Sequence, residues 1–369
     1  MGIQERIKEI ELEMSRTQKN KATEYHLGLL KSRLAKLRSQ LLEGDSAGKG
    51  GGGGDRDFEV VKYGDARVAL VGFPSVGKST FLSSITQTQS EAAAYEFTTL
   101  TCVPGILNYK GATIQILDLP GIIEGAAQGK GRGRQVIATA RSADLILLML
   151  DATKANTQAP LLERELESVG IRMNKRPPNV LFKPKKTGGI AFTATVPLTH
   201  MNEKLCYGIL HEFKIHNADI VIREDITVDE FLDVVEGNRQ YIRCLHVVNK
   251  IDAITIEEVD RLARLPNTTV ISCNLNLNFE RLLEVMWEYL ELCRVYTRRR
   301  GAPPDFEDPL VLRKGAKVID ACRAIHRSLA DPHNFRYALV WGLSAKHDPQ
   351  RVGLQHDLDD EDVIQVIKK

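Results

Sequence analysis

Residues 72–79 read Gly72-Phe73-Pro74-Ser75-Val76-Gly77-Lys78-Ser79 and follow the apolar run 68–71. The pattern G-x-x-x-x-G-K-S, placed after a predicted strand and before a helix-like stretch from Thr80, is typical of a phosphate-binding loop. The glycines permit a tight turn, so that backbone N–H groups converge on a phosphate. Lys78 would place its charge on the β- and γ-phosphates, and the Ser79 hydroxyl would bind Mg²⁺. Alone, this loop predicts a bound nucleoside triphosphate and leaves the base open.

A second loop indicates the base. Asn249-Lys250-Ile251-Asp252 follows the apolar run 245–248. Guanine presents an N1–H and an N2 amine side by side, and the Asp252 carboxylate would accept both in a charge-assisted pair. Adenine has no such pair, and sites of this kind reject the wrong partner by roughly 10⁴–10⁵-fold. We expect Asn249 to tie this loop to residues 72–79 and the Lys250 stem to cover the base.

Three shorter segments complete the predicted site. Asp118-Leu119-Pro120-Gly121 follows the strand-like run 114–117, so that Asp118 would hold Mg²⁺ through water and the Gly121 N–H would contact the γ-phosphate. Phe97-Thr98-Thr99 lies about twenty residues after the first loop, and Thr99 would close over the nucleotide with its hydroxyl on Mg²⁺. Ser272-Cys273-Asn274 would contact the guanine O6 through backbone N–H groups. The predicted nucleotide contacts are residues 72–80, 97–99, 118–121, 249, 250, 252 and 272–274, with Lys78, Thr99 and Gly121 as catalytic residues and Ser79, Thr99 and Asp118 as metal ligands.

Ile122 limits the predicted chemistry. Ras-like proteins have a Gln directly after D-x-x-G that orients the attacking water, and an isoleucine cannot do so. Hydrolysis must then rely on another group, a partner or a monovalent cation, and we expect slow intrinsic turnover, with about 10⁻⁴ s⁻¹ as a guide. The run 125–133, with four glycines, is a loop that a γ-phosphate could reorder.

The rest of the chain indicates a multidomain α/β protein. Its 369 residues carry a formal net charge of +2, and its six cysteines contain no C-x-x-C pair, so that neither a zinc framework nor a disulfide scaffold is expected. The longest apolar run, 145–150, is too short to span a bilayer, and residues 1–13 have no signal-peptide core. We therefore expect a cytoplasmic protein without a membrane segment.

Apolar periodicity divides the chain into modules. Short β-rich runs alternate with helix-like stretches from residue 66, which predicts a mostly parallel sheet with helices on both faces. A small α/β insert interrupts this pattern, with short strands expected at Ile190–Thr195, Asp219–Ile222 and Val228–Val235. After residue 293, the order strand, strand, helix, strand, strand predicts a β-grasp module. The predicted boundaries are 1–47 for a helical hairpin, 48–63 for a glycine-rich linker, 64–169 and 238–292 for the two parts of the nucleotide-binding domain, 170–237 for the insert and 293–369 for the last module.

Basic residues are concentrated on the second predicted helix of the hairpin. Lys31, Arg33, Lys36 and Arg38 lie mainly off the leucine seam of this helix. Two interpretations remain open: a solvated face on a self-packed hairpin, or a surface that contacts RNA or an acidic partner.

These motifs together resemble an Obg-type GTPase. The resemblance rests on GFPSVGKST at 72–80, YEFTTL at 95–100, DLPG at 118–121 and the glycine-rich run that follows. Over its whole length the chain resembles the DRG proteins (developmentally regulated GTP-binding proteins) of eukaryotes. The resemblance implies a P-loop GTPase domain with an N-terminal helical hairpin, an insert of the ribosomal-protein type and a C-terminal TGS domain of β-grasp type.

The resemblance also implies an activity and partners. It implies binding of GTP and GDP with Mg²⁺, hydrolysis stimulated by K⁺, a cytoplasmic location, association with ribosomes and RNA, and a zinc-finger partner of the DFRP type; no DNA is expected. Two departures stand out. Many K⁺-activated GTPases have an Asn where this chain has Ser75, and the more usual Ser-Ala-Lys is replaced by Ser272-Cys273-Asn274.

Two other functions compete with a regulatory GTPase. Ile122 is compatible with a nucleotide-gated scaffold in which GTP binding, and not hydrolysis, carries the function. A metabolic P-loop kinase is disfavoured because no acceptor-binding element is visible and because residues 249–252 indicate guanine.

Overall fold

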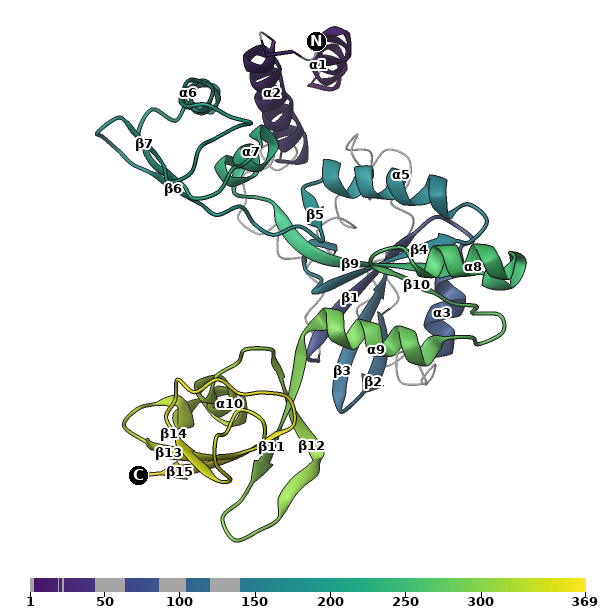
Figure 1. The fold of residues 1–369 in the computed structure, drawn as a ribbon, viewed down its shortest axis with the longest axis vertical. Coiled ribbons are helices and arrows are strands. Elements are labelled where there is room, and N and C mark those ends of the chain that lie inside the picture. Colours follow the sequence, from purple (N-terminus) through teal and green to yellow (C-terminus); the bar gives the residue numbers. More distant parts are fainter. Residues whose placement is uncertain (1–2, 19, 22, 44–63, 86–103, 120–139) are drawn as a thin grey trace, which may run out of the picture. The chain divides into compact units, whose positions relative to one another are not determined.

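The computed structural model describes residues 3–18, 20–21, 23–43, 64–85, 104–119 and 140–369 (Figure 1). The chain divides into two compact units, which are treated separately below. The first unit comprises residues 1–59, 122–141 and 163–242, and the second comprises residues 60–121, 142–162 and 243–369.

The helices and strands follow one another in a βα order in the middle of the chain. The helices are α1 Ile3–Arg16, α2 Glu24–Glu43, α3 Lys78–Ile85, α5 Ala155–Ser168, α6 Glu203–Glu212, α7 Val228–Glu236, α8 Ile256–Ala263, α9 Phe279–Leu290 and α10 Val318–Ile325, with short 3₁₀ turns η2 Ile251–Ala253 and η3 Arg327–Ala330. The strands are β1 Ala66–Gly72, β2 Pro104–Tyr109, β3 Ala112–Asp118, β4 Leu145–Asp151, β5 Ile171–Met173, β6 Val180–Pro184, β7 Ile190–Ala194, β8 Ala218–Ile222, β9 Gln240–Asn249, β10 Thr268–Val270, β11 Leu292–Arg298, β12 Pro304–Arg313, β13 Phe335–Trp341, β14 Gln350–Val352 and β15 Asp362–Lys368.

The largest sheet has the order β10-β9-β4-β1-β3-β2, with β5 paired to the start of β9. Its pairs are parallel except for the edge strand β2, which runs antiparallel to β3. All residues of β1 are buried, as expected for a parallel strand covered on both faces. Helices α3 and α9 pack on one of these faces, where the rings of Phe81 and Phe279 stack at 6.1 Å. The predicted α/β architecture with a mostly parallel sheet is confirmed.

The insert has a separate small sheet of order β6-β8-β7, against which α6 and α7 pack. The prediction of a strand at Val228–Val235 is wrong, because this segment forms α7. Thr227 and Glu230 form a reciprocal capping box at its start, and Gly237 ends it with a φ of 64°. The segment is rich in β-branched and aromatic residues, but its capping residues determine the helix.

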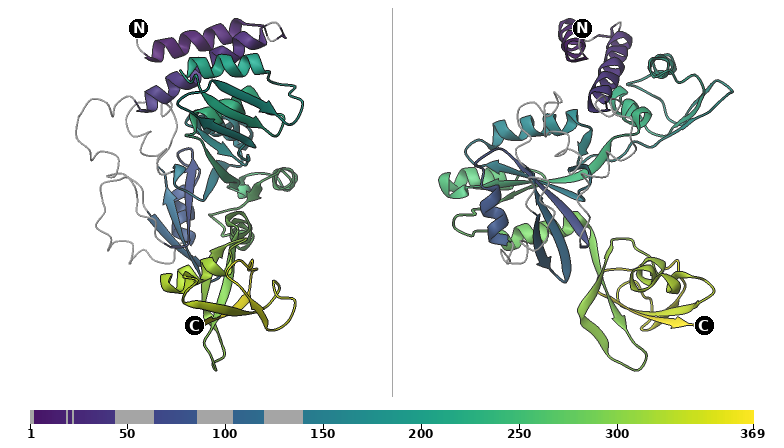
Figure 2. Two further views of the ribbon diagram at one scale, coloured as in Figure 1. Left: turned by 90° about the vertical axis from the view of Figure 1, so that its left-hand side faces the viewer. Right: turned by 180° about the vertical axis from the view of Figure 1, so that it is seen from behind.

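The N-terminal hairpin packs on the insert within the first unit. Figures 1 and 2 show α2 lying beside α6 and α7. The packing of α2 on α6 is close because each of these helices has a glycine that faces the other. A Cβ atom at Gly28 would lie 2.7 Å from Leu205 Cδ1, and one at Gly208 would lie 2.8 Å from the Tyr25 hydroxyl. A side chain at Gly28 would therefore meet the buried Leu205, whereas one at Gly208 would meet the exposed Tyr25.

The basic residues of α2 contact acidic groups of the insert. Lys31 Nζ lies 2.6 Å from Asp229 Oδ2, and Arg33 Nη2 lies 2.7 Å from Glu212 Oε1. Lys36 donates to the Glu212 carbonyl at 2.6 Å. These residues therefore attach the hairpin to the insert within one chain, and contact with RNA or a separate acidic partner stays a prediction.

The C-terminal module is a five-stranded sheet of order β12-β11-β15-β13-β14 with α10 packed on one face. The order strand, strand, helix, strand, strand is present as predicted for a β-grasp module. The short strand β14 and the turn η3 were not expected from the sequence.

Buried cysteines lie in the insert, in the nucleotide-binding domain and in the C-terminal module. No disulfide joins the five described cysteines, and Cys102 lies outside the described residues. Burial raises the pKa of Cys206 in the insert to about 12 and those of Cys273, Cys293 and Cys322 to about 11. Over the described residues, no helix is both long enough and apolar enough to cross a membrane.

Candidate nucleotide site

The phosphate-binding loop connects the end of β1 to the start of α3. Ser75 and Gly77 adopt positive φ angles of 63° and 97°. A Cβ atom at Gly72 would lie 2.5 Å from the Met149 carbonyl oxygen, and one at Gly77 would lie 2.4 Å from Asn249 Nδ2. Both glycines are therefore needed because backbone or a buried amide approaches them closely.

Lys78 folds back over this loop. Its Nζ donates to the carbonyl oxygens of Gly72 at 2.9 Å and Phe73 at 3.1 Å. Burial lowers the pKa of Lys78, and the nearby Asp118 carboxylate opposes this shift in part. A bound phosphate would offer the Lys78 ammonium a full negative charge, whereas these carbonyl oxygens offer only partial charges. Ser79 and Thr80, in the first turn of α3, are exposed.

Asp118 ends β3 directly beside β1, in register with Leu70. Burial raises the pKa of Asp118, and the Lys78 charge lowers it less strongly. Its Oδ1 is buried and has no hydrogen-bond partner among the described residues. Such a group calls for water or an ion. A carboxylate in this state fits the predicted contact with Mg²⁺ through water, because Mg²⁺ usually keeps several waters and uses few protein ligands.

Asn249 joins the phosphate-binding loop to the base loop. Its Nδ2 donates to the Val76 carbonyl at 2.8 Å, and its Oδ1 accepts the backbone N–H groups of Lys250 at 2.8 Å and Cys273 at 3.0 Å. The residue is only 2% exposed. One amide therefore fixes three segments at the carboxyl ends of the parallel strands, where ligands bind in open α/β sheets.

Lys250 is anchored by a residue that the sequence did not single out. Lys250 has a φ of 67°, and its Nζ lies 2.7 Å from Asp151 Oδ2 at the end of β4. Burial raises the pKa of Asp151, but hydrogen bonds from Lys250 and Thr153 outweigh it, so that the net shift is downward. The sequence did contain a signal for this contact, because the acidic residue Asp151 directly follows the apolar run 145–150.

Asp252 is oriented by Ser272. The Ser272 hydroxyl donates to Asp252 Oδ1 at 2.5 Å and accepts the Leu275 N–H at 3.2 Å. Ser272 is buried and Asp252 is exposed, so that a fixed hydroxyl holds a carboxylate that faces solvent. Asp252 keeps its remaining lone pairs for a base with two adjacent N–H donors.

The backbone N–H groups of residues 272–274 differ in their hydrogen-bond partners. The Ser272 N–H donates to the Leu277 carbonyl at 3.3 Å, and the Cys273 N–H donates to Asn249. Among the described residues, the Asn274 N–H has no acceptor. The contact of residues 272–274 with guanine O6 stays a prediction.

Known proteins match the chain over its full length. Developmentally-regulated GTP-binding protein 2 of Homo sapiens is 65% identical over 369 residues, and an uncharacterized GTP-binding protein of Caenorhabditis elegans is 66% identical over 371 residues; each alignment covers 100% of both chains. The family description "50S ribosome-binding GTPase" matches residues 67–183, "C-terminal region of MMR_HSR1 domain" matches 187–292 and "TGS domain" matches 293–368. The chain belongs to the developmentally regulated GTP-binding proteins.

Membership of the DRG family confirms the resemblance found in the sequence. A DRG chain is a GTPase with a P-loop domain and a C-terminal TGS domain, and both parts are present here. The nucleotide residues described above all lie in the second unit of the DRG chain.

Part of the predicted site lies outside the described residues. This applies to Phe97, Thr98 and Thr99, to Pro120 and Gly121, and to Ile122 with the glycine-rich run 125–133. The roles assigned to them in the DRG chain stay predictions.

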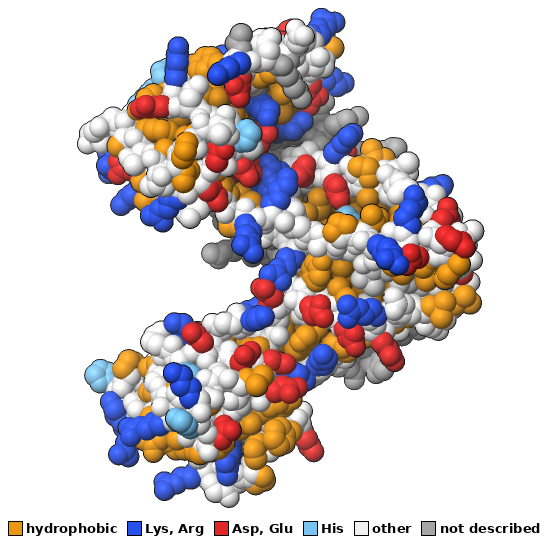
Figure 3. Space-filling view, viewed as in Figure 1, with side chains coloured by type: hydrophobic (Ala, Val, Ile, Leu, Met, Phe, Trp, Pro, Cys, Tyr) orange, Lys and Arg blue, Asp and Glu red, His pale blue; other side chains and the backbone are white. Residues whose placement is uncertain are grey.

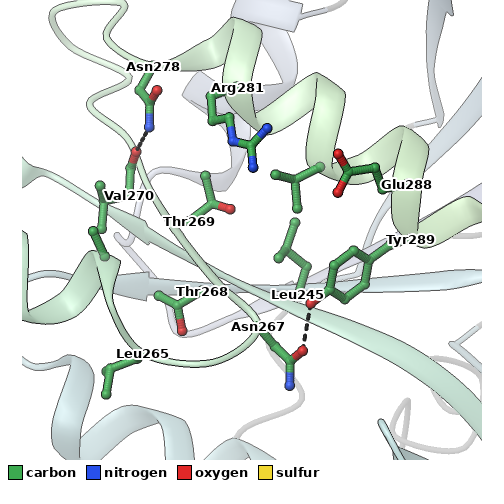
Figure 4. A pocket seen from close by; sticks show the side chains of 12 residues that line it. Leu245, Leu265, Asn267, Thr268, Thr269, Val270, Asn278, Arg281, Glu288 and Tyr289 are labelled. Carbon is green, nitrogen blue, oxygen red and sulfur yellow. Dashed lines mark hydrogen bonds between the residues drawn. The ribbon is translucent and has the colours of Figure 1, made fainter.

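A pocket of about 380 Å³ lies elsewhere in the same unit (Figure 4). It opens at the edge strand β10, where Tyr289 donates to Asn267 Oδ1 at 2.6 Å and Asn278 donates to the Val270 carbonyl at 2.7 Å. None of the predicted nucleotide contacts lines it. We therefore locate the DRG nucleotide site from the chemistry of residues 72–79 and 249–252, and not from the size of this pocket.

Proposed function

We propose that this chain is a regulatory GTPase of the cytoplasm that associates with ribosomes during translation, binds GTP with Mg²⁺ and hydrolyses it slowly to GDP and phosphate. The observation that carries the proposal is the position of Asn249. Its side chain joins the predicted phosphate-binding loop to the predicted guanine-binding loop. One amide thus links the residues that would contact the two ends of the nucleotide. The ribosome is suggested by the description of the family matched at residues 67–183 and by the DRG resemblance.

We further propose that K⁺ and a zinc-finger partner of the DFRP type stimulate this hydrolysis. Ile122 cannot orient water, so that an external group is needed. Ser75 is exposed and has a φ of 63°, a backbone conformation that asparagine adopts more readily than serine does. The Ser75→Asn variant should therefore fit the loop and strengthen K⁺ stimulation if the cation binds beside this residue.

The test compares phosphate release from GTP by the purified full-length chain in Na⁺ and in K⁺, with and without ribosomes. Slow release that rises with K⁺ and with ribosomes is expected, and Lys78→Met should abolish it. No release in any of these conditions would contradict the GTPase proposal, and equal release with and without ribosomes would contradict the ribosomal part.

The alternative is a nucleotide-gated scaffold, which the isoleucine at position 122 favours. Here a variant that binds GTP but does not hydrolyse it would sustain function in cells. Under the main proposal such a variant stays in the GTP state and fails, so that complementation separates the two.

A further inference from the structure

The ion pair of Asp151 and Lys250 lies between the two loops of the nucleotide site. In the order β9-β4-β1, the strand β4 separates β1, which ends in the phosphate-binding loop, from β9, which ends in the base loop. Asp151 is the last residue of β4 and is in register with Asn249. Neighbouring strands are about 4.8 Å apart, so that a nucleotide that reaches both loops must pass close to the end of β4.

The Lys250 side chain spans part of this path. Its backbone directly follows Asn249 at the end of β9, and its Nζ lies 2.7 Å from Asp151 Oδ2 at the end of β4. The methylene groups of the lysine therefore extend from the base loop toward the middle of the site. The side chain is 40% exposed, so that this apolar stem has a free face that a planar base can cover.

Asp151 is fixed in position by the turn that precedes α5. Its Oδ1 accepts the Thr153 hydroxyl at 2.7 Å and the Thr153 N–H at 3.0 Å. The Asp151 N–H donates to Gln158 Oε1 at 3.0 Å, and the Asp151 side chain is only 15% exposed. One carboxylate oxygen is thus used by the turn, and the other remains for Lys250. A lysine has many rotamers, and a carboxylate fixed in this way selects one of them.

An ion pair alone does not mark a functional residue. Figure 3 shows acidic and basic side chains lying side by side on the surface of α8 and α9. On α8, Asp260 Oδ2 lies 2.8 Å from Arg264 Nε, and these side chains are 60% and 77% exposed. Pairs of this kind contribute little, because water screens them. The pair of Asp151 and Lys250 differs because its carboxylate is largely buried and because it joins two strand ends of the site.

We propose that Asp151 is a positioning residue for the guanine base and sets the rate at which GDP and GTP dissociate. By holding the Lys250 ammonium, Asp151 keeps the lysine stem against one face of the base, while Asp252 binds the edge of the base. Without this carboxylate the lysine can turn into solvent, and the base loses one of its contacts. The phosphate-binding loop lies on the other side of β4, so that the contacts of the phosphates should stay unchanged.

This inference deepens the proposed GTPase function and rests on the guanine site at residues 249–252. The two fail separately. A chain that binds no GDP would refute both the site and the role of Asp151, whereas GDP binding that is independent of Asp151 would refute only the role of Asp151.

The test measures the dissociation of fluorescently labelled GDP from the full-length protein after unlabelled GDP is added in excess. Asp151→Asn should speed dissociation about 10-fold, which lies within the range of coupling between residues in contact. Lys250→Met keeps the apolar stem and removes the charge, so that its effect should equal that of Asp151→Asn. Lys250→Ala removes the stem as well and should speed dissociation further.

The double variant separates positioning from general destabilisation. Because Asp151 acts through Lys250, Asp151→Asn should change nothing further in the Lys250→Met background. Competition by inorganic triphosphate, which has no base, is the second readout, and its affinity should be the same in the unchanged protein and in Asp151→Asn. Effects that multiply in the double variant, or a loss of triphosphate affinity equal to that of GDP, would overturn the proposal.

Asp260→Asn provides the matched control, because it removes the same carboxylate from an exposed ion pair of the same unit. It should leave the dissociation of GDP unchanged. Equal acceleration by Asp260→Asn and Asp151→Asn would also contradict the role of Asp151. Circular dichroism at the temperature of the measurement establishes that each variant is folded.

Discussion

Asp252 and Ser272 form a pair that no linear motif displays. The motif at residues 249–252 predicts the carboxylate, but the buried hydroxyl that orients it comes from a different strand end. Replacing Asp252 tests the base specificity that this pair creates.

Asp252→Asn should bind GTP about 10²-fold less tightly or weaker still, because two hydrogen bonds to a charged acceptor are lost. The variant should bind xanthosine triphosphate instead, because the amide nitrogen can donate to the C2 carbonyl of xanthine. Competition binding with the two nucleotides measures this, with the exposed Asp260→Asn on α8 as the control. Unchanged GTP affinity would refute the role of Asp252.

Asp118 and Asp151 should respond to the same substitution in opposite directions. The pKa of Asp118 is raised in the folded chain, so that its charge opposes folding at pH 7. The net pKa shift of Asp151 is downward, so that its charge stabilises the fold. Without nucleotide, Asp118→Asn should therefore raise the unfolding temperature at pH 7, and Asp151→Asn should lower it.

The pH dependence of these two effects follows from the same shifts. The gain in Asp118→Asn should disappear as the pH falls through the raised pKa of Asp118, because the carboxyl group then becomes neutral in the unchanged protein as well. The loss in Asp151→Asn should also fade in acid, as Asp151 becomes protonated. Because the pKa of Asp151 lies below the ordinary aspartate value of 3.8, this loss should stay constant down to that pH and fade only below it. Thermal unfolding from pH 7 to about pH 2 measures both effects, and a stabilising Asp151→Asn would contradict the assignment.

The crossing of α2 with α6 depends on two glycines whose surroundings differ. At Gly28 a methyl group would meet Leu205, which is 2% exposed and has no room to move, and overpacking of this kind costs about 1–3 kcal/mol. At Gly208 it would meet Tyr25, which is 40% exposed and can turn outward. Alanine also stabilises a helix by about 1 kcal/mol relative to glycine.

Gly28→Ala should therefore loosen the hairpin from the insert, whereas Gly208→Ala should be neutral or stabilising. The rate of trypsin cleavage within residues 1–43 measures how often the hairpin detaches. Equal protection of both variants would contradict the close packing at Gly28.

Elements with a clear apolar rhythm could be predicted from the sequence, and those defined by tertiary contacts could not. The runs that form β1, β3, β4 and β9 are long and apolar because both faces of these strands are buried. β2 begins with Pro104-Gly105, residues that are depleted in strands, and it forms because β3 offers an edge.

The same distinction holds for the site. The positions of the loops follow from motifs, whereas the Asp151–Lys250 ion pair and the use of the Cys273 N–H by Asn249 join residues distant in sequence. Single-sequence patterns contain no signal for such contacts, because they depend on which strand ends the fold brings together.

The two units should unfold separately, because each has a buried core of its own. The described nucleotide residues all belong to the second unit. A ligand stabilises only the part of a protein that binds it, by about 2.7 kcal/mol at a hundred times its dissociation constant. Calorimetry with and without GTP and Mg²⁺ should show two transitions, of which only that of the second unit shifts. A single transition that shifts as a whole would contradict this independence.

The buried cysteines give the insert, the GTPase domain and the TGS domain a chemical reporter each. At neutral pH a thiol with a pKa of about 11 is ionised to only about one part in 10⁴, so that alkylating reagents and peroxide attack it slowly while it is buried. Cys206 would become reactive when the insert opens, Cys244 and Cys273 when the GTPase domain opens, and Cys293 and Cys322 when the TGS domain opens. Mass spectrometry of alkylated peptides could thus follow the opening of three modules in one unmodified chain, and the same burial should protect its thiols from oxidation in a stressed cell.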